Sequence, residues 1–578
     1  MPDVRFTTLL PLLTAVLGLT FLVHETAAQG DVIIGCPTYG CTPSGTFSSV
    51  LGNFPQGNVT VRWTSQVSQA PLPGSPLGCV GNDVNIVCPA IRLKGTGYVS
   101  VNPINGSIQW TDELLRFPPL PIMNIGGDII ACDGNSLVYY FNSGKMNGKA
   151  ITMEPSERPV YSLTMANNNL FFIISRQSGR LITYTTDGIP MGSIYINDKI
   201  NSQTGAFVPI AQPVIAGHRV YILMEFKVNN GGTQPSAPIL RLYAVDLRDI
   251  MVQIIKVIWI YNFTSEVETP RSFLGDIGGY LPNDDPSGPR LMVYRHYVYL
   301  VIPAETNDVA SSGTNGVKNR LLVFHDNGTS GTLKYTQDLD VVRMAAEESL
   351  NTAVPKPHHP PQNQGQRSQI NRASDNLRAI FGQEVYDIPE RFMGLAKPVA
   401  RGPVRLRRDS TLRFHPSAHQ QRIKESNPEV QAIWLATRSG GLYRMKYDDG
   451  DILTTLQLSK ALNVSSFNMT SELMIISSQD GNAQGPVLVF AGIAETATSA
   501  AKNGDVPSMS IFYNYMYVVD IKGSVKLALP VPMNGTVQGQ IMGIPTDDDP
   551  SRQSDLLVAY SRVSEGNQLF AYGYHKTK

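Results

Sequence analysis

The sequence has no net charge and few charged side chains. Lys plus Arg and Asp plus Glu number 47 each, and charged residues make up only 16% of the chain. No excess of basic residues is present that would attract nucleic acid or an acidic surface. Glycine and proline, by contrast, are plentiful at 50 and 40 residues. This composition is typical of a turn-rich β protein rather than a helical one.

Common catalytic signatures are also missing from the sequence. It has no Gly-x-Ser-x-Gly elbow, no His-Glu-x-x-His and no phosphate-binding glycine-rich loop followed by Lys-Ser or Lys-Thr. His218 and His296 lie beside apolar runs, where a structural histidine is commoner than a catalytic base. His358 and His359 belong to a Pro/Gln-rich stretch typical of a solvated linker, with weak metal binding as the alternative. The catalytic residues, if any, are therefore unknown from sequence.

Only one long apolar run is present, at the amino terminus. A single arginine precedes the run Thr7–Val23, and the small residues Ala27 and Ala28 follow it. This layout predicts a signal peptide over residues 1–28. An uncleaved membrane anchor is the alternative, because the run approaches the length of a bilayer span. The proline inside the run and the small residues after it favour cleavage. We expect a secreted, extracellular protein without a membrane span after signal removal.

Sequons support the same location. Asn-x-Ser/Thr triplets occur at Asn58, Asn105, Asn262, Asn327, Asn463, Asn468 and Asn534. Such triplets are acceptors for N-linked glycans on the surface of secreted proteins. We therefore expect a glycoprotein whose glycans serve solubility, although not every triplet need be used.

Cysteine is scarce, and all five cysteines lie in the first quarter of the chain. In an oxidising compartment, the short spacings from Cys36 to Cys41 and from Cys79 to Cys88 suggest local disulfides, with other pairings left open. Cys132 is then left over, and we expect it to be buried. Metal ligation is the alternative, but the histidine partners of a zinc site are missing nearby.

A two-part unit of strand-like runs recurs along the chain. The clearest copies are Val220–Phe226 with Leu240–Asp246, and Leu170–Ser175 with Leu181–Thr185. About eight such units can be counted at uneven spacing. Four-stranded sheets of this kind bury both faces when they pack radially. The pattern predicts an all-β fold, a single β-propeller of about eight blades or seven. A set of β-sandwiches is the alternative, but no linker divides the units into blocks.

Two fragments resemble a known repeat. Val99–Trp110 and Arg241–Trp259 run from an apolar strand through an Asp or Asn turn to a tryptophan. They are similar to the tryptophan-docking repeat of the quinoprotein alcohol dehydrogenase-like β-propellers, the PQQ-type repeat. The resemblance implies that Trp110 and Trp259 pack between blades. Asn58–Trp63 is a candidate for the outer strand of the last blade, which would close the ring and remove exposed edges.

The sequence departs from the catalytic members of that superfamily. Quinoprotein dehydrogenases carry adjacent cysteines over the cofactor and a calcium held by acidic and amide side chains. Here the closest cysteines are Cys36 and Cys41, and most units end without tryptophan. The resemblance therefore implies the scaffold without the quinone cofactor, and we expect no PQQ.

Clustered carboxylates on Pro-flanked loops are the sequence's candidate calcium ligands. The segments Gly279–Pro289 and Gly543–Gln553 resemble each other and supply hard oxygen ligands. Turns that use aspartate to satisfy local backbone groups are the alternative. The candidate ligands are Asp284, Asp285, Asp547, Asp548 and Asp549, and Asp448, Asp449 and Asp451 form a weaker third group.

The recurring strand-like runs are interrupted over residues 341–429. Pro355–Asn371 is poor in apolar residues and is expected to be disordered. A basic stretch follows, in which Arg405–Arg408 resembles the Arg-x-Arg-Arg site of furin-like convertases and predicts cleavage after Arg408. Binding of a polyanion such as a sulfated glycan is a second interpretation. A solvated loop is the third.

The organisation predicted is therefore a signal peptide, a cysteine-containing segment and a propeller interrupted by an insertion. The boundaries are 1–28, 29–57, 58–340 for the first part of the propeller, 341–429 for the insertion and 430–578 for the last part. Long loops over residues 227–238, 304–318 and 495–507 would emerge on one face if they join the second and third strands of their blades.

The function predicted is a binding or structural module for an extracellular protein or glycan, with the ligand and oligomeric state unknown. An extracellular enzyme with its site in the propeller channel, as a residual quinoprotein or a hydrolase-like propeller, is the alternative. The residues that face the channel discriminate the two. Converging carboxylates or histidines would favour the enzyme, and a plugged channel would argue against it.

Overall fold

The computed structural model describes the strands and most short turns of this chain. The described residues are 35–51, 54, 59–70, 78–115, 120–124, 126–133, 136–146, 151–152, 164–167, 170–174, 178–186, 188–200, 203–228, 238–250, 254–263, 289–305, 317–347, 432–478, 486–497, 510–546 and 555–574. Contacts divide the chain into one unit of residues 1–364 with 432–578 and a second of residues 365–431. All described residues belong to the first unit, and everything below concerns that unit.

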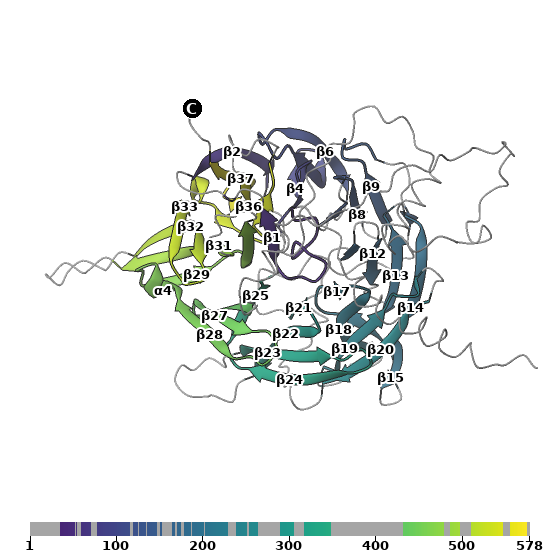
Figure 1. Cartoon of the computed structure of the whole chain (residues 1–578). Coiled ribbons are helices and arrows are strands. Elements are labelled where there is room, and N and C mark those ends of the chain that lie inside the picture. The colour runs from purple at the N-terminus through teal and green to yellow at the C-terminus, as the bar shows by residue number, and fades with distance from the viewer. Residues whose placement is uncertain are drawn as a thin grey trace, which may run out of the picture. The chain divides into compact units, whose positions relative to one another are not determined.

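The described strands form eight sheets, which we number as blades in chain order (Figure 1). Blade 1 contains β3 (Val80–Gly81), β4 (Ile86–Arg92), β5 (Gly95–Val101) and β6 (Ile108–Leu115). Blade 2 contains β7 (Ile122–Met123), β8 (Ile129–Asp133), β9 (Ser136–Tyr140) and β10 (Ile151–Thr152). Blade 3 contains β11 (Thr164–Asn167), β12 (Leu170–Ile174), β13 (Arg180–Thr185) and β14 (Pro190–Tyr195). Blade 4 contains β15 (Asn197–Ile200), β16 (Gln203–Pro209), β17 (Val214–Ala216), β18 (Arg219–Val228), β19 (Leu240–Asp246) and β20 (Lys256–Asn262).

The second half repeats the pattern and recruits two strands from the amino terminus. Blade 5 contains β21 (Arg290–Tyr294), β22 (Tyr297–Glu305), β23 (Val317–Asp326) and β24 (Gly331–Gln337). Blade 6 contains β25 (Val341–Ala346), β26 (Ala432–Thr437), β27 (Gly441–Lys446) and β28 (Ile452–Gln457). Blade 7 contains β29 (Ser466–Met469), β30 (Met474–Ser478), β31 (Val487–Ala497), β32 (Ser510–Asp520), β33 (Val525–Pro530) and β1 (Ser48–Leu51). Blade 8 contains β34 (Thr536–Val537), β35 (Met542–Ile544), β36 (Leu556–Val563), β37 (Gly566–Tyr574) and β2 (Val59–Ser68), and two short helices, α4 (Leu458–Ala461) and η5 (Pro532–Asn534), follow β28 and β33.

Apolar clusters join most blades to the next, and a hydrogen bond is described at the remaining junction. Buried side chains of blades 1 and 2 form one cluster, those of blades 2 and 3 a second, and those of blades 4 and 5 a third. Blades 5 and 6 share a fourth cluster, and the largest one runs through blades 6, 7 and 8 into blade 1. Between blades 3 and 4, Gln212 Nε2 donates to Thr164 Oγ1 at 2.7 Å. The packing therefore runs round a complete ring, and the predicted all-β propeller is confirmed.

The ring closes through strands from both ends of the chain. β2 pairs antiparallel with β37, from Val59 opposite Tyr574 to Ser68 opposite Asn567, and forms the outer strand of blade 8. The prediction that Asn58–Trp63 begins the outer strand of the last blade is confirmed for its described residues. Trp63 of this strand donates from Nε1 to Pro103 O of blade 1 at 2.9 Å, so the last blade is also anchored to the first.

The outer strands dock on the neighbouring blade as the PQQ-type repeat implies. Trp110 of β6 stacks on Tyr140 of blade 2 and donates from Nε1 to Asn142 O at 3.0 Å. Trp259 of β20 covers Gly331 of blade 5, where a Cβ atom would approach the indole to 2.6 Å. Both predicted tryptophans therefore pack between blades. Tyr335 and Leu456 take the same position at later junctions, over Gly450 and Gly523, so other side chains replace the tryptophan there.

The predicted start of the insertion and the three predicted long loops can be compared with the observed strands. Val341–Ala346, which sequence analysis placed at the start of the insertion, instead form β25, the inner strand of blade 6, and all six residues are buried. The short run contains an arginine and does not alternate, so periodicity alone missed it. The described part of blade 6 before the gap therefore extends to Glu347 and resumes at Ala432. The loops over 227–238, 304–318 and 495–507 do join second and third strands, β18 to β19, β22 to β23 and β31 to β32.

Candidate functional site: the central channel

The chain's own amino-terminal segment lies against the inner strands of the propeller. We call residues 35–51 the plug. Its backbone follows the inner wall in the order of the blades, as the purple segment inside the ring shows (Figure 1). The hydrogen bonds join Cys36 to Gly81 in both directions, Pro37 O to Met123 N, Pro43 O to Ile215 N, Ser44 O to Val293 N, Thr46 O to Ala346 N and Phe47 O to Ile475 N. The plug thus contacts inner strands of blades 1, 2, 4, 5, 6 and 7 through the main chain.

The plug is buried and fixed at both of its ends. Its last residues form β1, which pairs parallel with β30 from Ser48 opposite Ile475 to Leu51 opposite Ser478. At its start, Cys36 exchanges two backbone hydrogen bonds with Gly81 of blade 1. A disulfide within the plug joins Cys36 to Cys41, and both side chains are fully buried. Unpaired backbone groups are costly when buried, so strand-like hydrogen bonding is what allows a polar chain segment to occupy this position.

Hydroxyl groups satisfy one another in the middle of the plug. Thr42 Oγ1 lies 3.0 Å from Ser44 Oγ and 2.8 Å from Thr46 Oγ1, and Thr46 Oγ1 lies 2.9 Å from Ser48 Oγ. Thr42 Oγ1 also accepts from the Thr46 backbone N–H at 3.1 Å. The cluster therefore binds itself and leaves little polar capacity for a ligand.

A buried ionic network ties the plug to three consecutive blades. Glu472, just before β30, accepts two hydrogen bonds from Arg290 of β21 at 2.8 and 2.9 Å and lies 3.1 Å from Arg343 Nε of β25. Tyr39 of the plug donates to Glu472 at 3.4 Å and accepts from Arg290 at 3.3 Å. Only 5% of Glu472 is exposed. One carboxylate therefore holds two guanidinium groups and the plug's only tyrosine.

The charges within this network affect one another unequally. Despite burial, Glu472 raises the pKa of Arg290, whereas burial and the charge of Arg290 lower the pKa of Arg343. Burial pushes the pKa of Glu472 upward, but Arg290 and Arg343 outweigh it and hold that pKa below its ordinary range. Burial together with the Glu472 charge raises the pKa of Tyr39 to about 12. At neutral pH the network therefore contains a carboxylate, two guanidinium groups and a neutral phenol.

Gln540 fixes the plug from blade 8. Its Oε1 accepts from the Gly40 backbone N–H at 2.9 Å, while its Nε2 donates to Thr38 O at 3.2 Å and to Cys79 O at 2.9 Å. The side chain is fully buried. With this contact the plug touches blade 8 as well, so its described contacts reach seven of the eight blades.

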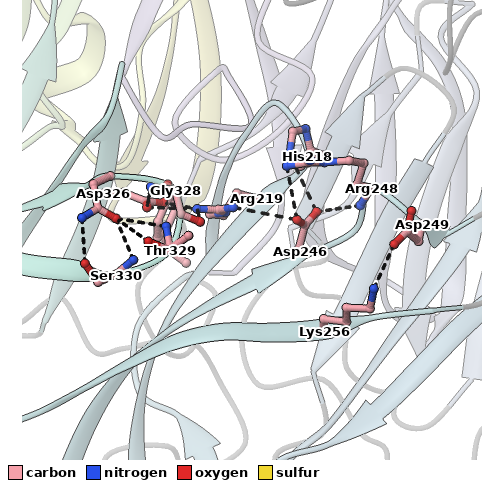
Figure 2. A network of polar contacts seen from close by, with 12 residues as sticks. His218, Arg219, Asp246, Arg248, Asp249, Lys256, Asp326, Gly328, Thr329 and Ser330 are labelled. Atoms are coloured by element: carbon pink, nitrogen blue, oxygen red, sulfur yellow. Dashed lines mark hydrogen bonds and ion pairs between the residues drawn. The ribbon is translucent and has the colours of Figure 1, made fainter. Parts of the chain in front are cut away.

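A second polar network lies at the junction of blades 4 and 5 (Figure 2). Arg219 of β18 donates from Nη1 to both Asp326 oxygens, at 2.9 and 2.8 Å, and Tyr221 donates to Asp326 at 2.7 Å. Burial raises the pKa of Asp326, but the hydrogen bonds from Tyr221 and Arg219 outweigh it and lower that pKa. Arg219 Nη1 and the Tyr221 hydroxyl are both paired with Asp326, whereas the buried Nε of Arg219 has no hydrogen-bond partner.

His218 lies beside this junction, next to Asp246 and Arg248 (Figure 2), and 48% of its side chain is exposed. Its Nε2 lies 3.8 Å from Asp246 and accepts from Arg248 Nε at 3.1 Å. Burial lowers the pKa of His218, and the Asp246 charge opposes that shift. A histidine held between arginine and aspartate fits the structural role expected from sequence. His296 lies in the turn before β22, where its carbonyl accepts from the Asp326 N–H at 2.8 Å.

Only some of the site residues predicted from the sequence lie within the described residues. Asp284, Asp285, Asp547, Asp548, Asp549 and Arg408 lie outside the described residues, as do Asn58, His358 and His359. Asp449 and Asp451 each lie 3.3 Å from Lys446 Nζ. In the described part of the chain, no group of three or more His, Cys, Asp or Glu side chains is placed to hold a metal ion.

The sequons and cysteines can be located in part. The asparagines at 105, 262, 327, 463 and 468 are all exposed, and the side chain of Asn534 lies outside the described set. The cysteines pair locally, as the spacing suggested, with Cα atoms 4.0 Å apart for Cys36–Cys41 and 4.5 Å for Cys79–Cys88. Cys132 belongs to neither pair and is buried. Among the described helices none is long and apolar enough to cross a membrane.

The plug and its ionic network were not predicted from sequence. The cysteine-containing segment was recognised, but its place inside the ring was not. Arg290, Arg343 and Glu472 lie far apart in the chain, each in or beside an apolar run, and no motif marks them. A weak signal does exist in the glycines at 35, 40 and 45. All three have positive φ, and they space tight turns five residues apart along the plug.

Comparisons with known proteins found similarity in structure but not in sequence. No protein-family profile and no curated protein matches the sequence. Among solved structures, a quinohemoprotein alcohol dehydrogenase from Comamonas testosteroni aligns at 9% identity and TM-score 0.40, covering 97% of this chain and 83% of that one. BamB from Moraxella catarrhalis aligns at 9% identity and TM-score 0.39, over 90% of this chain and all of that one. Sqt1 from Saccharomyces cerevisiae aligns at 8% and 0.38, over 92% and 100%. The strand topology and the docked tryptophans described above make this chain a β-propeller with PQQ-type, degenerate blade docking.

Proposed function

We propose that this chain is a secreted glycoprotein that acts as a binding or structural module for an extracellular protein or glycan. The observation that carries the proposal is the plug. The inner strands of a propeller surround the place where a small substrate would bind, and here those strands are hydrogen-bonded to the chain itself. Recognition is therefore assigned to the outer surfaces of the disc.

The competing proposal is an extracellular enzyme with its site in the channel. For that function the plug would have to leave, which breaks the main-chain bonds to six blades and uncovers the Arg290, Arg343 and Glu472 network. Leaving a buried charged group unpaired costs several kcal/mol. Nothing in the described contacts offers a compensating interaction, so the plug is assigned a permanent structural role.

The strand topology supports a recognition surface on one face of the disc. The three long loops join second to third strands in blades 4, 5 and 7, and such connections leave a propeller on the same side. Asn463 lies just before blade 7, Asn468 lies in its strand β29, and both are exposed. Glycans there would flank that blade and would serve solubility.

The binding proposal is tested with the protein secreted from eukaryotic cells. A heparin column, as a sulfated-glycan probe, compares the full chain with a variant in which a short Asn-Gly turn replaces residues 348–431, because β25 and β26 are antiparallel and need a turn between them. This deletion is narrower than residues 341–429 because β25 must be kept. Earlier elution of the variant in a salt gradient supports a polyanion partner, and equal elution removes that partner class.

A second measurement separates the binding module from the enzyme. Titration calorimetry with PQQ and calcium, and dye-linked alcohol oxidation, are run on the full chain and on a variant lacking residues 29–51. We expect neither protein to turn over alcohols. Oxidation that appears only when the plug is removed would overturn the proposal.

A further inference from the structure

The two arginines of the channel network lie against the same carboxylate oxygen. Arg290 Nη1 is 2.9 Å and Arg343 Nε is 3.1 Å from Glu472 Oε2. The two guanidinium groups are therefore close neighbours, although they come from the inner strands of blades 5 and 6. Like charges at so short a distance repel each other, most strongly where water is largely excluded. The single carboxylate can neutralise only one of them.

The surrounding charged side chains do not supply the missing negative charge. Among the described residues, Arg290 and Arg343 form no ion pair with a carboxylate other than Glu472. The charge of Arg438 also acts to lower the pKa of Arg343, and Arg438 is itself paired with Asp340 at 3.2 Å. The channel network therefore keeps one positive charge in excess.

Both guanidinium groups also keep N–H donors that no described residue accepts. A guanidinium group carries five such donors on three nitrogens. Arg290 makes all of its hydrogen bonds to described residues through Nη1, which leaves Nε and Nη2. Arg343 donates from Nε to Ser471 O at 3.2 Å and from Nη1 to Val342 O at 2.9 Å, which leaves Nη2. Unused donors in largely buried groups indicate a site for a water molecule or an ion.

The part of the network that a solute can reach is its positively charged part. The side chain of Arg290 is 20% exposed and that of Arg343 is 10% exposed, whereas the side chain of Glu472 is only 6% exposed. A small ion can therefore approach the guanidinium groups, while the carboxylate stays covered. The enclosure also means that water screens the excess charge poorly.

We propose that Arg290 and Arg343 form a binding site for one small monovalent anion of the size of chloride, which neutralises the excess charge of the channel network. One negative charge matches the one positive charge in excess, and a divalent anion would reverse the imbalance. The anion accepts charge-assisted hydrogen bonds from the unused N–H groups of both arginines. It joins blades 5 and 6 beside the plug and stabilises the ring. This role is separate from recognition on the outer surfaces of the disc.

Thermal unfolding at constant ionic strength tests the site with chloride as the probe. Sodium chloride replaces sodium gluconate stepwise in a solution of the full secreted protein, so that screening of surface charges stays the same. Above the dissociation constant, each tenfold rise in chloride should shift the unfolding equilibrium about tenfold toward the folded protein, because the unfolded chain has no such site. An unfolding midpoint that does not rise with chloride would overturn the proposal.

Two substitutions in the network should change the chloride dependence in opposite directions. Arg343→Met removes the excess charge and should abolish the rise with chloride. Glu472→Gln adds a second unneutralised charge and should lower the chloride dissociation constant at least about tenfold. Arg219→Met is the matched control and should leave that constant within about threefold, because Arg219 lies between two carboxylates, Asp326 and Asp246. A rise with chloride that persists in Arg343→Met, or weaker binding in Glu472→Gln, would contradict the assigned site.

Bromide locates the anion directly and does not depend on how well the variants fold. Crystals of the parent protein grown in sodium bromide should show an anomalous-scattering peak within hydrogen-bonding distance of guanidinium nitrogens of both Arg290 and Arg343. Peaks that lie only on the outer surface of the protein would overturn the proposal.

Discussion

Two networks in this propeller use the same three kinds of side chain for different tasks. In the channel, Glu472 holds Arg290, Arg343 and the plug's Tyr39. At the junction of blades 4 and 5, Asp326 holds Arg219 and Tyr221. The junction network joins neighbours that already share an apolar cluster. The channel network joins three blades to a segment that arrives from the other end of the chain.

The two networks differ in how many carboxylates are available to each arginine. Arg219 has a second carboxylate, Asp246, 3.8 Å from its Nη2, so its charge is shared. Among the described residues, Glu472 is the only carboxylate that contacts Arg290 and Arg343, and the three groups together carry one excess positive charge. The channel network should therefore depend on its single carboxylate more than the junction network does.

Removing that carboxylate is expected to have the largest effect. Glu472→Ala leaves two buried guanidinium groups without their partner, which should lower the free energy of unfolding by about 3–5 kcal/mol. Asp326→Ala should cost less, about 2 kcal/mol, because Arg219 keeps Asp246. Urea denaturation followed by tryptophan fluorescence measures both. An equal or larger loss for Asp326→Ala would break the comparison.

Sequence reasoning found the propeller because its signals are local. Apolar runs, turns and the Val99–Trp110 repeat each fall within a dozen or so residues, and β2 could be matched to the last blade by its pattern alone. Glu472 and Tyr39, by contrast, are 433 residues apart. Each looks ordinary in its own segment, so no local rule can pair them. The plug was missed for the same reason, since its partners are single residues on separate strands.

The blade junctions themselves can be tested at a glycine beneath a docked tryptophan. Gly144 has φ +79°, and a Cβ there would lie 2.3 Å from Trp110 Cγ. Gly144→Ala should therefore cost about 2–3 kcal/mol through steric overlap and backbone strain together. Gly217 is the matched control, with φ +58° and no atom within 4 Å of its added Cβ.

Gly217→Ala isolates the backbone term and should cost about 1 kcal/mol. Thermal unfolding of both variants gives the difference. If Gly144→Ala were no worse than Gly217→Ala, the docking of Trp110 would not contribute to the junction. In that case the channel network, rather than tryptophan docking, would be the main contact that holds the blades in place.

Replacing the tyrosine of each network should give a smaller difference in stability, and here the junction network should lose more than the channel network. Tyr221 donates to Asp326 at 2.7 Å, whereas Tyr39 donates to Glu472 at 3.4 Å. Tyr221→Phe should lower stability by about 2 kcal/mol, and Tyr39→Phe by less than about 1 kcal/mol, because a long hydrogen bond is weak. Urea midpoints measure the pair. A larger loss for Tyr39→Phe would mean that the plug is held mainly by its phenol.

The dependence on pH provides the finest test of the channel network. The pKa of Glu472 is lowered in the folded protein by Arg290 and Arg343, despite the opposing effect of burial. A group with a depressed folded pKa stabilises the fold above its unfolded pKa, about 4.3 for glutamate, and this contribution is lost as pH falls through the folded pKa. The stability difference between the parent and Glu472→Gln should therefore be full at pH 7 and shrink below about pH 4. Asp326→Asn, whose parent carboxyl also has a lowered pKa, should converge in the same direction. A difference for Glu472→Gln that stays constant from pH 7 to pH 3 would mean that its charge is not what holds the plug.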